Sequence, residues 1–371
     1  MNIRELAERA RVSPSTVSRV VNHIPTVNRK LAKRVWKAVA ELGYSPNWQA
    51  RALASGKSRI LGLVVSDMTD PFFPEIIQSF ETAAVQGGYQ ILVASTLHDP
   101  KRIELSLCRM VERRIEGVAV LTFGSEESFI ENLQAQGIPV VFVDVESYVR
   151  KTSVVRIDYG RGSRQAVQHL AALRHERIAY IPGPLHSKAA LAKRSAFEKC
   201  MPEIGLSASS KLIVAGDDTV EGGMRAFTQL AQFRNRPTAI FCSNDMTAVG
   251  VIRRAYELGV AVPQELSVIG FDDISFARFI TPPLTTVRVP QAELAKLAFH
   301  ALIRELDRAK CKTNEPREYV LDTDLVLRRS TSLAQRRGST VAALHPLESD
   351  SGGEDPLMEH ARHNQVMIAR L

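Results

Sequence analysis

Short apolar runs and amphipathic helical patterns alternate along this chain from residue 60 onward, and this alternation restricts the fold more than any other feature. Runs typical of buried strands occur at Ile60–Val65, Gln90–Ala94, Gly117–Leu121, Val140–Val143, Ile178–Ile181, Ala239–Phe241 and Leu266–Ile269. Helical patterns lie between them at Glu75–Gln86, Ile103–Arg113, Gly162–Leu173, Gly222–Ala231 and Met246–Leu258. Such alternation predicts parallel sheets that helices cover on both faces. We therefore expect an α/β domain of two lobes that divide near Asp158.

The first sixty residues differ in charge from the rest of the chain. They hold twelve Lys or Arg against three acidic residues, a net charge of +9, whereas the whole chain carries +8. A basic unit beside a nearly neutral body is typical of a protein that binds a polyanion such as nucleic acid. A membrane surface would also select a basic segment, but it would require bulky apolar residues on the opposite helix face.

The basic segment has the pattern of three short helices. Apolar residues recur at helical spacing in residues 3–10, and the tripeptide Arg11-Val12-Ser13 interrupts them. Ser13 is a favourable N-cap and Pro14 suits the first position of a second helix. Two short helices joined by a three-residue turn predict a helix-turn-helix, whose second helix enters the major groove. A basic third helix follows at 29–42. The alternative is a solvated three-helix bundle without a role in DNA binding.

Composition and motifs exclude several classes. A chain of 371 residues is too long for one core and predicts two or three domains. Four distant cysteines without a CxxC pair indicate buried thiols rather than a metal site. Gly160-Arg161-Gly162 resembles the start of a dinucleotide loop, but Gln165 stands at the third glycine position, so we expect no cofactor. The chain has neither a signal-peptide pattern nor an 18-residue apolar run, which predicts a cytoplasmic protein without a membrane partner.

Two stretches of sequence carry a family resemblance. The segments IRELAERARVSPSTVSRVVN and ELGYSPNWQARALASGKSRILGLVVSD resemble the head of the LacI family of bacterial regulators, and together with the body the resemblance covers about 330 residues. It implies a multidomain protein with three parts. These are an all-α helix-turn-helix DNA-binding head, a short hinge helix and an α/β two-lobed sensor domain like the periplasmic binding proteins.

The resemblance also implies which residues meet DNA. Pro14, Ser15 and Arg19 stand at family positions that contact bases. The guanidinium of Arg19 can bond O6 and N7 of guanine together, whereas Pro14 offers only apolar contact. Phosphate contacts, which position a protein without reading sequence, are expected at Thr16, Ser18, Asn22 and Asn47.

Residues Asn47–Ala54 match the hinge helix of the family. Eight residues are too few to be helical alone in water, so this segment should become ordered only when it is packed and bound to DNA. Leu53 matches the position that wedges into the minor groove at the operator centre, where two leucines of a symmetric dimer unstack a base step. The alternative is a leucine that packs the linker onto the body.

Ligands of open α/β sheets bind beyond the carboxyl ends of strands. Here the resemblance implies effector contacts from Phe72, Phe73, Lys193, Asp218, Asn244, Asp245 and Asp272. Their carboxylates and amide suit vicinal hydroxyls, which predicts a carbohydrate. Lys193 replaces the arginine of most relatives and Asp218 replaces an aromatic residue of some, so the ligand of a relative does not transfer. The alternative for strand-end aspartates is that they cap the helices that follow.

The predicted domain boundaries follow from these patterns. The head covers 1–46, the hinge helix and linker 47–57, and the sensor domain 58–332. The first lobe takes about 58–157 and 288–316 and the second about 158–287 and 317–332, with crossovers near Asp158, Thr286 and Glu318. Residues 333–371 lack periodicity and are expected to be largely disordered. They contain no leucine heptad run, which favours a dimer over a tetramer.

The function predicted from these features is transcription regulation. We expect a repressor that binds a pseudo-palindromic operator as a homodimer and is controlled by a small molecule, a carbohydrate, held between the lobes. One alternative is a solute-binding protein, against which the basic head and the missing signal peptide argue. Another is a hydrolase that uses Asp272 or Asp245, but no nucleophile–base pair is identifiable, so we expect no enzyme.

Overall fold

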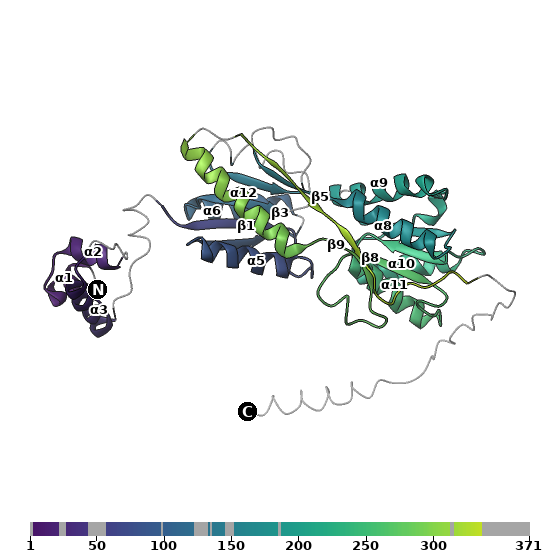
Figure 1. Ribbon diagram of the computed structural model, residues 1–371, viewed down its shortest axis with the longest axis horizontal. Coiled ribbons are helices and arrows are strands. Elements are labelled where there is room, and N and C mark those ends of the chain that lie inside the picture. Colours follow the sequence, from purple (N-terminus) through teal and green to yellow (C-terminus); the bar gives the residue numbers. More distant parts are fainter. Residues whose placement is uncertain are drawn as a thin grey trace, which may run out of the picture.

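The computed structural model describes residues 3–21, 27–43, 57–97, 99–121, 133, 136–144, 152–184, 187–311 and 315–335. The basic N-terminal segment forms the helices α1 (Ile3–Ala10), α2 (Pro14–Val21) and α3 (Arg29–Leu42) (Figure 1). Their apolar faces meet in a small core of Leu6, Ala7, Ala10, Val17, Val20, Val21, Val35 and Ala38. The head therefore has a hydrophobic core of its own.

The first lobe is built on a parallel sheet of six strands in the order β10-β5-β4-β3-β1-β2. The strands are β1 (Ile60–Val65), β2 (Gln90–Ser95), β3 (Gly117–Leu121), β4 (Val140–Val143), β5 (Val154–Asp158) and β10 (Glu318–Asp322). Helices α5 (Phe73–Gln86) and α12 (Gln291–Cys311) cover one face, and α6 (Pro100–Glu112) covers the other. Burial on both faces explains why β1, β3 and β4 are apolar throughout.

The second lobe repeats this plan with a sheet of five strands in the order β11-β9-β8-β7-β6. Its strands are β6 (Ile178–Ile181), β7 (Ala239–Cys242), β8 (Ser267–Asp272), β9 (Thr285–Arg288) and β11 (Asp324–Val326). Helices α8 (Tyr159–Ala172) and α9 (Lys188–Glu203) pack on one face, and α10 (Val220–Ala231) and α11 (Asp245–Glu257) pack on the other. A short 3-10 helix, η1 (Ser210–Leu212), precedes α10. The two lobes share one design because both are βαβ units.

The chain passes between the lobes three times, and the predicted position of the last crossover is wrong. The prediction placed it near Glu318, but β10 pairs with β5 in the sheet of the first lobe, and only β11 joins the second lobe, antiparallel to β9. The crossover lies at Thr323, whose hydroxyl donates to the carbonyl of Asp158 at 2.6 Å and accepts from the amide of Gly162 at 3.0 Å. Alternating exposure in β10 identifies a strand but does not reveal which sheet it joins.

None of the helices in the described part of the chain combines the length and the hydropathy that a membrane crossing requires.

Candidate functional site

Helix α2 presents the side chains expected to meet DNA. The Ser13 hydroxyl accepts a hydrogen bond from the amide of Thr16 at 3.2 Å, so this residue caps the helix as predicted. Pro14, Ser15 and Arg19 are exposed, because the valines of the helix take the inward positions. Thr16 and Ser18 are partly buried. One helix face thus carries the three residues predicted to contact bases.

The hydroxyls at the start of α2 are linked through the cap. Ser13 Oγ lies 2.8 Å from Ser15 Oγ and 2.9 Å from Thr16 Oγ1. A phosphate or base that bound Ser15 would therefore share that hydroxyl with the cap. By contrast, Arg19 is exposed in the last turn of the helix. Among the predicted base contacts, Arg19 has the longest side chain.

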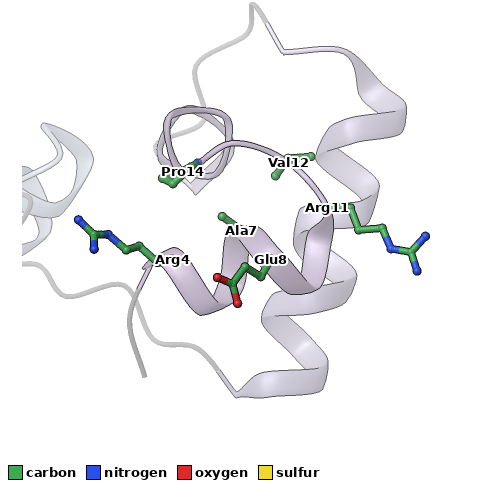
Figure 2. Close-up of a pocket in the computed structure, with 6 residues that line it drawn as sticks. All are labelled: Arg4, Ala7, Glu8, Arg11, Val12 and Pro14. Atoms are coloured by element: carbon green, nitrogen blue, oxygen red, sulfur yellow. The ribbon is translucent and has the colours of Figure 1, made fainter.

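Arg34, a basic residue of α3, bonds the turn between α1 and α2. The sequence pattern had placed this residue only on the charged face of a helix. Arg34 on α3 donates to the carbonyls of Ala10 at 2.7 Å and Arg11 at 2.8 Å, and so bonds the carboxyl end of α1. Beside this turn lies a shallow pocket of about 410 Å³ (Figure 2). Figure 2 shows the side chains of Arg4 and Arg11 extending in opposite directions from this pocket, with Glu8 between them.

Three residues of the predicted DNA interface lie outside the described residues: Asn22, Asn47 and Leu53. The proposed hinge helix at 47–54 lies there as well.

The second site lies where the two lobes meet. At its centre, the ammonium of Lys193 lies 3.1 Å from Asp272 Oδ1 and donates to the carbonyl of Ser243 at 3.0 Å. It also lies over the ring of Phe271, 4.2 Å from the centroid, and 5.3 Å from that of Tyr159. Both charged side chains are nearly buried, with 11% and 13% exposure. Lys193 and Asp272 therefore form an ion pair inside an aromatic wall.

The first lobe contributes a second carboxylate. Asp144, directly after β4, accepts a hydrogen bond from the hydroxyl of Tyr159, the first residue of α8. Burial raises the pKa of Asp144 to about 7, although the hydrogen bond from Tyr159 and the charge of Lys193 oppose this rise. Burial also raises the pKa of Asp272 to about 6, again against the charge of Lys193. Two carboxyl groups from different lobes thus titrate near neutral pH.

Two further aspartates complete the site. Asp70 precedes α5 in the first lobe and Asp218 precedes α10 in the second. Burial is the main cause that raises the pKa of Asp70, and the negative charge of Asp218 raises it further. The Asp218 carboxylate accepts from Ser243 Oγ at 2.6 Å. We use the name interlobe cluster for Asp70, Asp144, Tyr159, Lys193, Asp218, Ser243 and Asp272.

The backbone of this cluster is strained. Asp144 and Asp218 both have a φ of 62°, and Asp272 has a φ of 104°. Residues with side chains adopt this left-handed region rarely, and such residues gather at ligand and active sites. The approach of Asp218 also requires Gly183, because a Cβ there would lie 2.4 Å from the carboxylate. In these conformations the Asp144 carboxylate accepts from Tyr159, that of Asp218 accepts from Ser243, and that of Asp272 pairs with Lys193.

The structure separates the seven predicted effector residues into two groups. Lys193, Asp218 and Asp272 belong to the interlobe cluster. Phe72 lies directly before α5, two residues from Asp70, and is buried with 7% exposure in the core of the first lobe. Phe73 is 1% exposed and belongs to the core of the first lobe, where it packs edge-to-face on Phe72. Phe73 is therefore a core residue of the first lobe.

Asn244 and Asp245 follow the alternative interpretation of strand-end polar residues. Asn244 is the N-cap of α11, and its side chain accepts from the amide of Thr247 at 2.8 Å. Asp245 is fully buried and accepts from the amide of Ile274 at 2.8 Å and the hydroxyl of Thr286 at 2.5 Å. The carboxylate of Asp245 is thus bonded within the second lobe.

The prediction omitted Asp70, Asp144, Tyr159 and Ser243 from the site. A signal existed for Asp144, which directly follows a buried strand, and for Asp70, which precedes a helix in the loop after β1. No sequence pattern identified Tyr159 or Ser243, because their roles depend on contacts with residues far along the chain.

The raised pKa of Asp144 predicts a pH dependence of stability. The folded group has a pKa of about 7 against an ordinary 3.8, so it binds a proton that the unfolded chain does not bind near neutral pH. The melting temperature should therefore rise as the pH falls from about 8 to 6.5. Asp144→Asn should reduce this rise, measured by calorimetry of the full chain.

The comparison of the two slopes matters because burial lowers the pKa values of His169 and His175 from 6.5, so both residues oppose the rise as the pH approaches 6.5, in the parent chain and in the variant alike. The exposed Asp322→Asn serves as control and should keep the slope of the parent chain. An unchanged slope in Asp144→Asn would contradict a raised pKa at this residue.

Comparison with known proteins agrees with this architecture. Residues 2–47 match the family described as bacterial regulatory proteins, lacI family, and residues 167–331 match the periplasmic binding protein-like domain. The HTH-type transcriptional repressor PurR of Klebsiella pneumoniae (strain 342) is 34% identical over 332 residues, which cover 89% of this chain and 96% of that protein.

Solved structures resemble the chain over nearly its whole length. The Lac repressor dimer bound to operator and the anti-inducer ONPF aligns with a TM-score of 0.80 and 27% identity, covering 90% of this chain and 99% of that one. The complex of the transcriptional regulator CelR with cellobiose aligns with a TM-score of 0.68 and 28% identity, covering 89% and 99%. These relatives are regulators and not enzymes. The chain belongs to the LacI family and is a DNA-binding transcriptional repressor controlled by a small-molecule effector.

Proposed function

We propose that this repressor acts as a homodimer on a pseudo-palindromic operator and that its effector is a carbohydrate bound at the interlobe cluster. The observation that carries the proposal is the convergence of Asp70 and Asp144 from one lobe with Lys193, Asp218 and Asp272 from the other. Carboxylates accept hydrogen bonds from vicinal hydroxyls, and an aromatic residue such as Phe72 contacts the apolar face of a sugar ring. The resemblance to a cellobiose-bound regulator supports this ligand class.

The proposed mechanism couples the two sites through the lobes. An effector that contacts both lobes stabilises one angle between them, because its contacts are complete only there. In a dimer, that angle sets the separation of the paired hinges and heads. The coupling free energy of such systems is typically about 1–3 kcal/mol, which changes operator affinity roughly fivefold to 150-fold.

On the DNA side we propose that Arg19 reads a base, with Pro14 and Ser15 beside it, and that Thr16, Ser18, Asn22 and Asn47 contact phosphates. Leu53 is proposed to wedge into the central base step. The exposure of Pro14, Ser15 and Arg19 on α2 supports this assignment. A repressor acts where its DNA lies, so we also propose a cytoplasmic protein.

The proposal is tested with the full-length protein and a panel of cellobiose, lactose, maltose, ribose, glucose, glucosamine and galactosamine. We expect at least one sugar to raise the melting temperature, because a ligand that binds only the folded state stabilises it by mass action. The same sugar should change operator affinity at least fivefold. A panel without any thermal shift, or a bound sugar that leaves operator affinity unchanged, would refute the carbohydrate effector.

A further inference from the structure

Basic side chains gather at one edge of the first-lobe sheet, where the chain arrives from the head. Neighbouring strands of this sheet are all parallel, so their amino ends lie along a single edge. Four exposed basic residues precede β1 or β3 at this edge: Lys57, Arg59, Arg113 and Arg114. We use the name basic edge for these four residues.

Backbone contacts bring the two halves of the basic edge together. The amide of Arg59 donates to Glu116 Oε1 at 2.7 Å, across 57 positions of sequence, and the amide of Glu116 donates to the carbonyl of Ile60 at 2.8 Å. The starts of β1 and β3 therefore lie side by side, about 5 Å apart. The guanidinium of Arg59 lies over the ring of Tyr89, 5.1 Å from its centroid. The folded sheet thus combines two short basic segments into one surface.

Nearby acidic residues do not cancel the charge of the basic edge. Glu112 and Glu116 are the acids next to these cations in sequence, and Glu116 is partly buried and already accepts from the amide of Arg59. Four cations against two acids leave an excess of two positive charges. Within the described ranges, no ion pair involves Arg113 or Arg114. The carboxyl ends of the same strands are instead followed or ended by aspartates: Asp67, Asp99, Asp144, Asp158 and Asp322.

A purely structural role explains only part of this surface. Arg113 is the C-cap of α6, where positive charge complements the helix dipole. Arg114 follows with a φ of 54°, and Arg174 stands at the equivalent place after α8 of the second lobe with a φ of 65°. A role at the helix end therefore accounts for both lobes, but it does not account for the cations that precede β1.

The length of the chain keeps the basic edge close to DNA. Lys57 is four residues from Leu53, which we propose to insert at the operator centre, and four residues span at most about 14 Å. A DNA duplex carries one negative charge per about 1.7 Å of its axis. Exposed cations tethered at this distance face the densest negative charge that the repressor meets.

We propose that the basic edge binds the phosphate backbone at the centre of the operator, so that the sensor domain itself contacts DNA. This inference rests on the proposed DNA contacts of the hinge. The sheet holds the basic edge rigidly in the first lobe, so an effector that changes the orientation of this lobe also changes these phosphate contacts. Such contacts give the two states of the sensor different affinities for DNA, which is what control by an effector requires.

The first test removes two charges from the basic edge of the full-length protein. Arg113→Gln with Arg114→Gln should weaken operator binding roughly tenfold or more at 0.1 M salt, measured by fluorescence anisotropy. The slope of log K against log salt concentration should become less steep by about 2, because each phosphate contact contributes about 0.9 to it. An affinity and a salt slope equal to those of the parent protein would overturn the inference.

Neutral phosphates locate the contact on the DNA. Methylphosphonates at the operator centre remove negative charge from the duplex and should weaken binding of the parent protein. The double glutamine variant should lose at least threefold less on this duplex, because the partners of those phosphates are already absent. Equal losses in the parent and the variant would overturn the inference, since the arginines and the central phosphates would then act independently.

Two control variants separate charge from helix capping. Arg174→Gln removes the same side chain at the equivalent place of the second lobe and should keep the affinity, the salt slope and the response to methylphosphonates of the parent. Arg113→Lys with Arg114→Lys keeps both charges and should recover most of the affinity. A lysine variant as weak as the glutamine variant would contradict a contact that depends on charge.

The variant Leu53→Ala distinguishes this inference from the proposed hinge contacts. If Leu53→Ala weakens operator binding and the double glutamine variant binds like the parent, the hinge assignment stands and the inference is overturned. If Leu53→Ala binds like the parent and the glutamine variant shows both expected losses, the phosphate contact is upheld and the wedge is refuted.

Discussion

Replacing Arg19 with methionine should lower operator affinity roughly tenfold to a hundredfold, because one bidentate contact to guanine discriminates by about 1–3 kcal/mol. Arg19 is exposed on α2, and the apolar core of the head does not include its side chain, so the head should remain folded. Affinity for unrelated DNA should change far less. The measurement is fluorescence anisotropy at fixed salt, with the duplex that the repressor selects from a random pool as operator.

The matched control is Lys33→Met, an exposed basic residue on α3. Loss of a residue that contributes only positive charge should weaken binding to operator and to unrelated DNA by similar factors. It should also reduce the salt dependence of binding. Equal losses for both DNAs in the Arg19 variant would assign Arg19 to the phosphate backbone and contradict its role in base recognition.

Replacing Lys193 with methionine should lower the free energy of unfolding by about 3–5 kcal/mol, because removal of one partner leaves a nearly buried charge unpaired. Asp272 would lose its cation and would still face the charges of Asp70 and Asp218. The loss should be larger at pH 8 than at pH 5, since Asp272 can become neutral at the lower pH. Urea unfolding of the full-length protein at both pH values measures this effect.

The double variant Lys193→Met with Asp272→Asn separates the ion pair from packing. Removal of both charges should recover most of the lost stability, because no unpaired carboxylate remains at that position. Lys199→Met, an exposed position on the same helix, should alter stability by less than about 0.5 kcal/mol. If the double variant were no more stable than Lys193→Met, the loss would arise from packing and not from the ion pair.

Much of the α/β fold follows from sequence patterns because buried parallel strands are apolar without interruption. The bounds of β1, β3, β4 and β6 agree with the predicted runs. The prediction did not identify β5, which contains the exposed Arg156 within VVRID, or α9, whose apolar residues do not form one face. A strand with a charged residue in its middle and a helix without one apolar face obtain their stability from tertiary partners, which a sequence periodicity does not reveal.

The site was partly predictable for the same reason. Strand ends mark one edge of each sheet, and this position identified Asp272. Lys193 was identified instead by the family position that it matches. The ion pair between them, however, joins residues 79 positions apart. Whether a strand-end acid points outward or caps its own helix depends on local packing. This explains why Asp245 looked like a ligand contact but instead bonds Ile274 and Thr286.

The central claim is that occupation of the interlobe cluster changes the affinity of the head for DNA. The direct measurement is the operator Kd of the full-length repressor, with and without a saturating effector, together with the effector Kd with and without saturating operator. Because linkage is reciprocal, both Kd values should change by the same factor, expected to be at least fivefold. An operator Kd that stays the same while titration shows the effector bound would contradict the account.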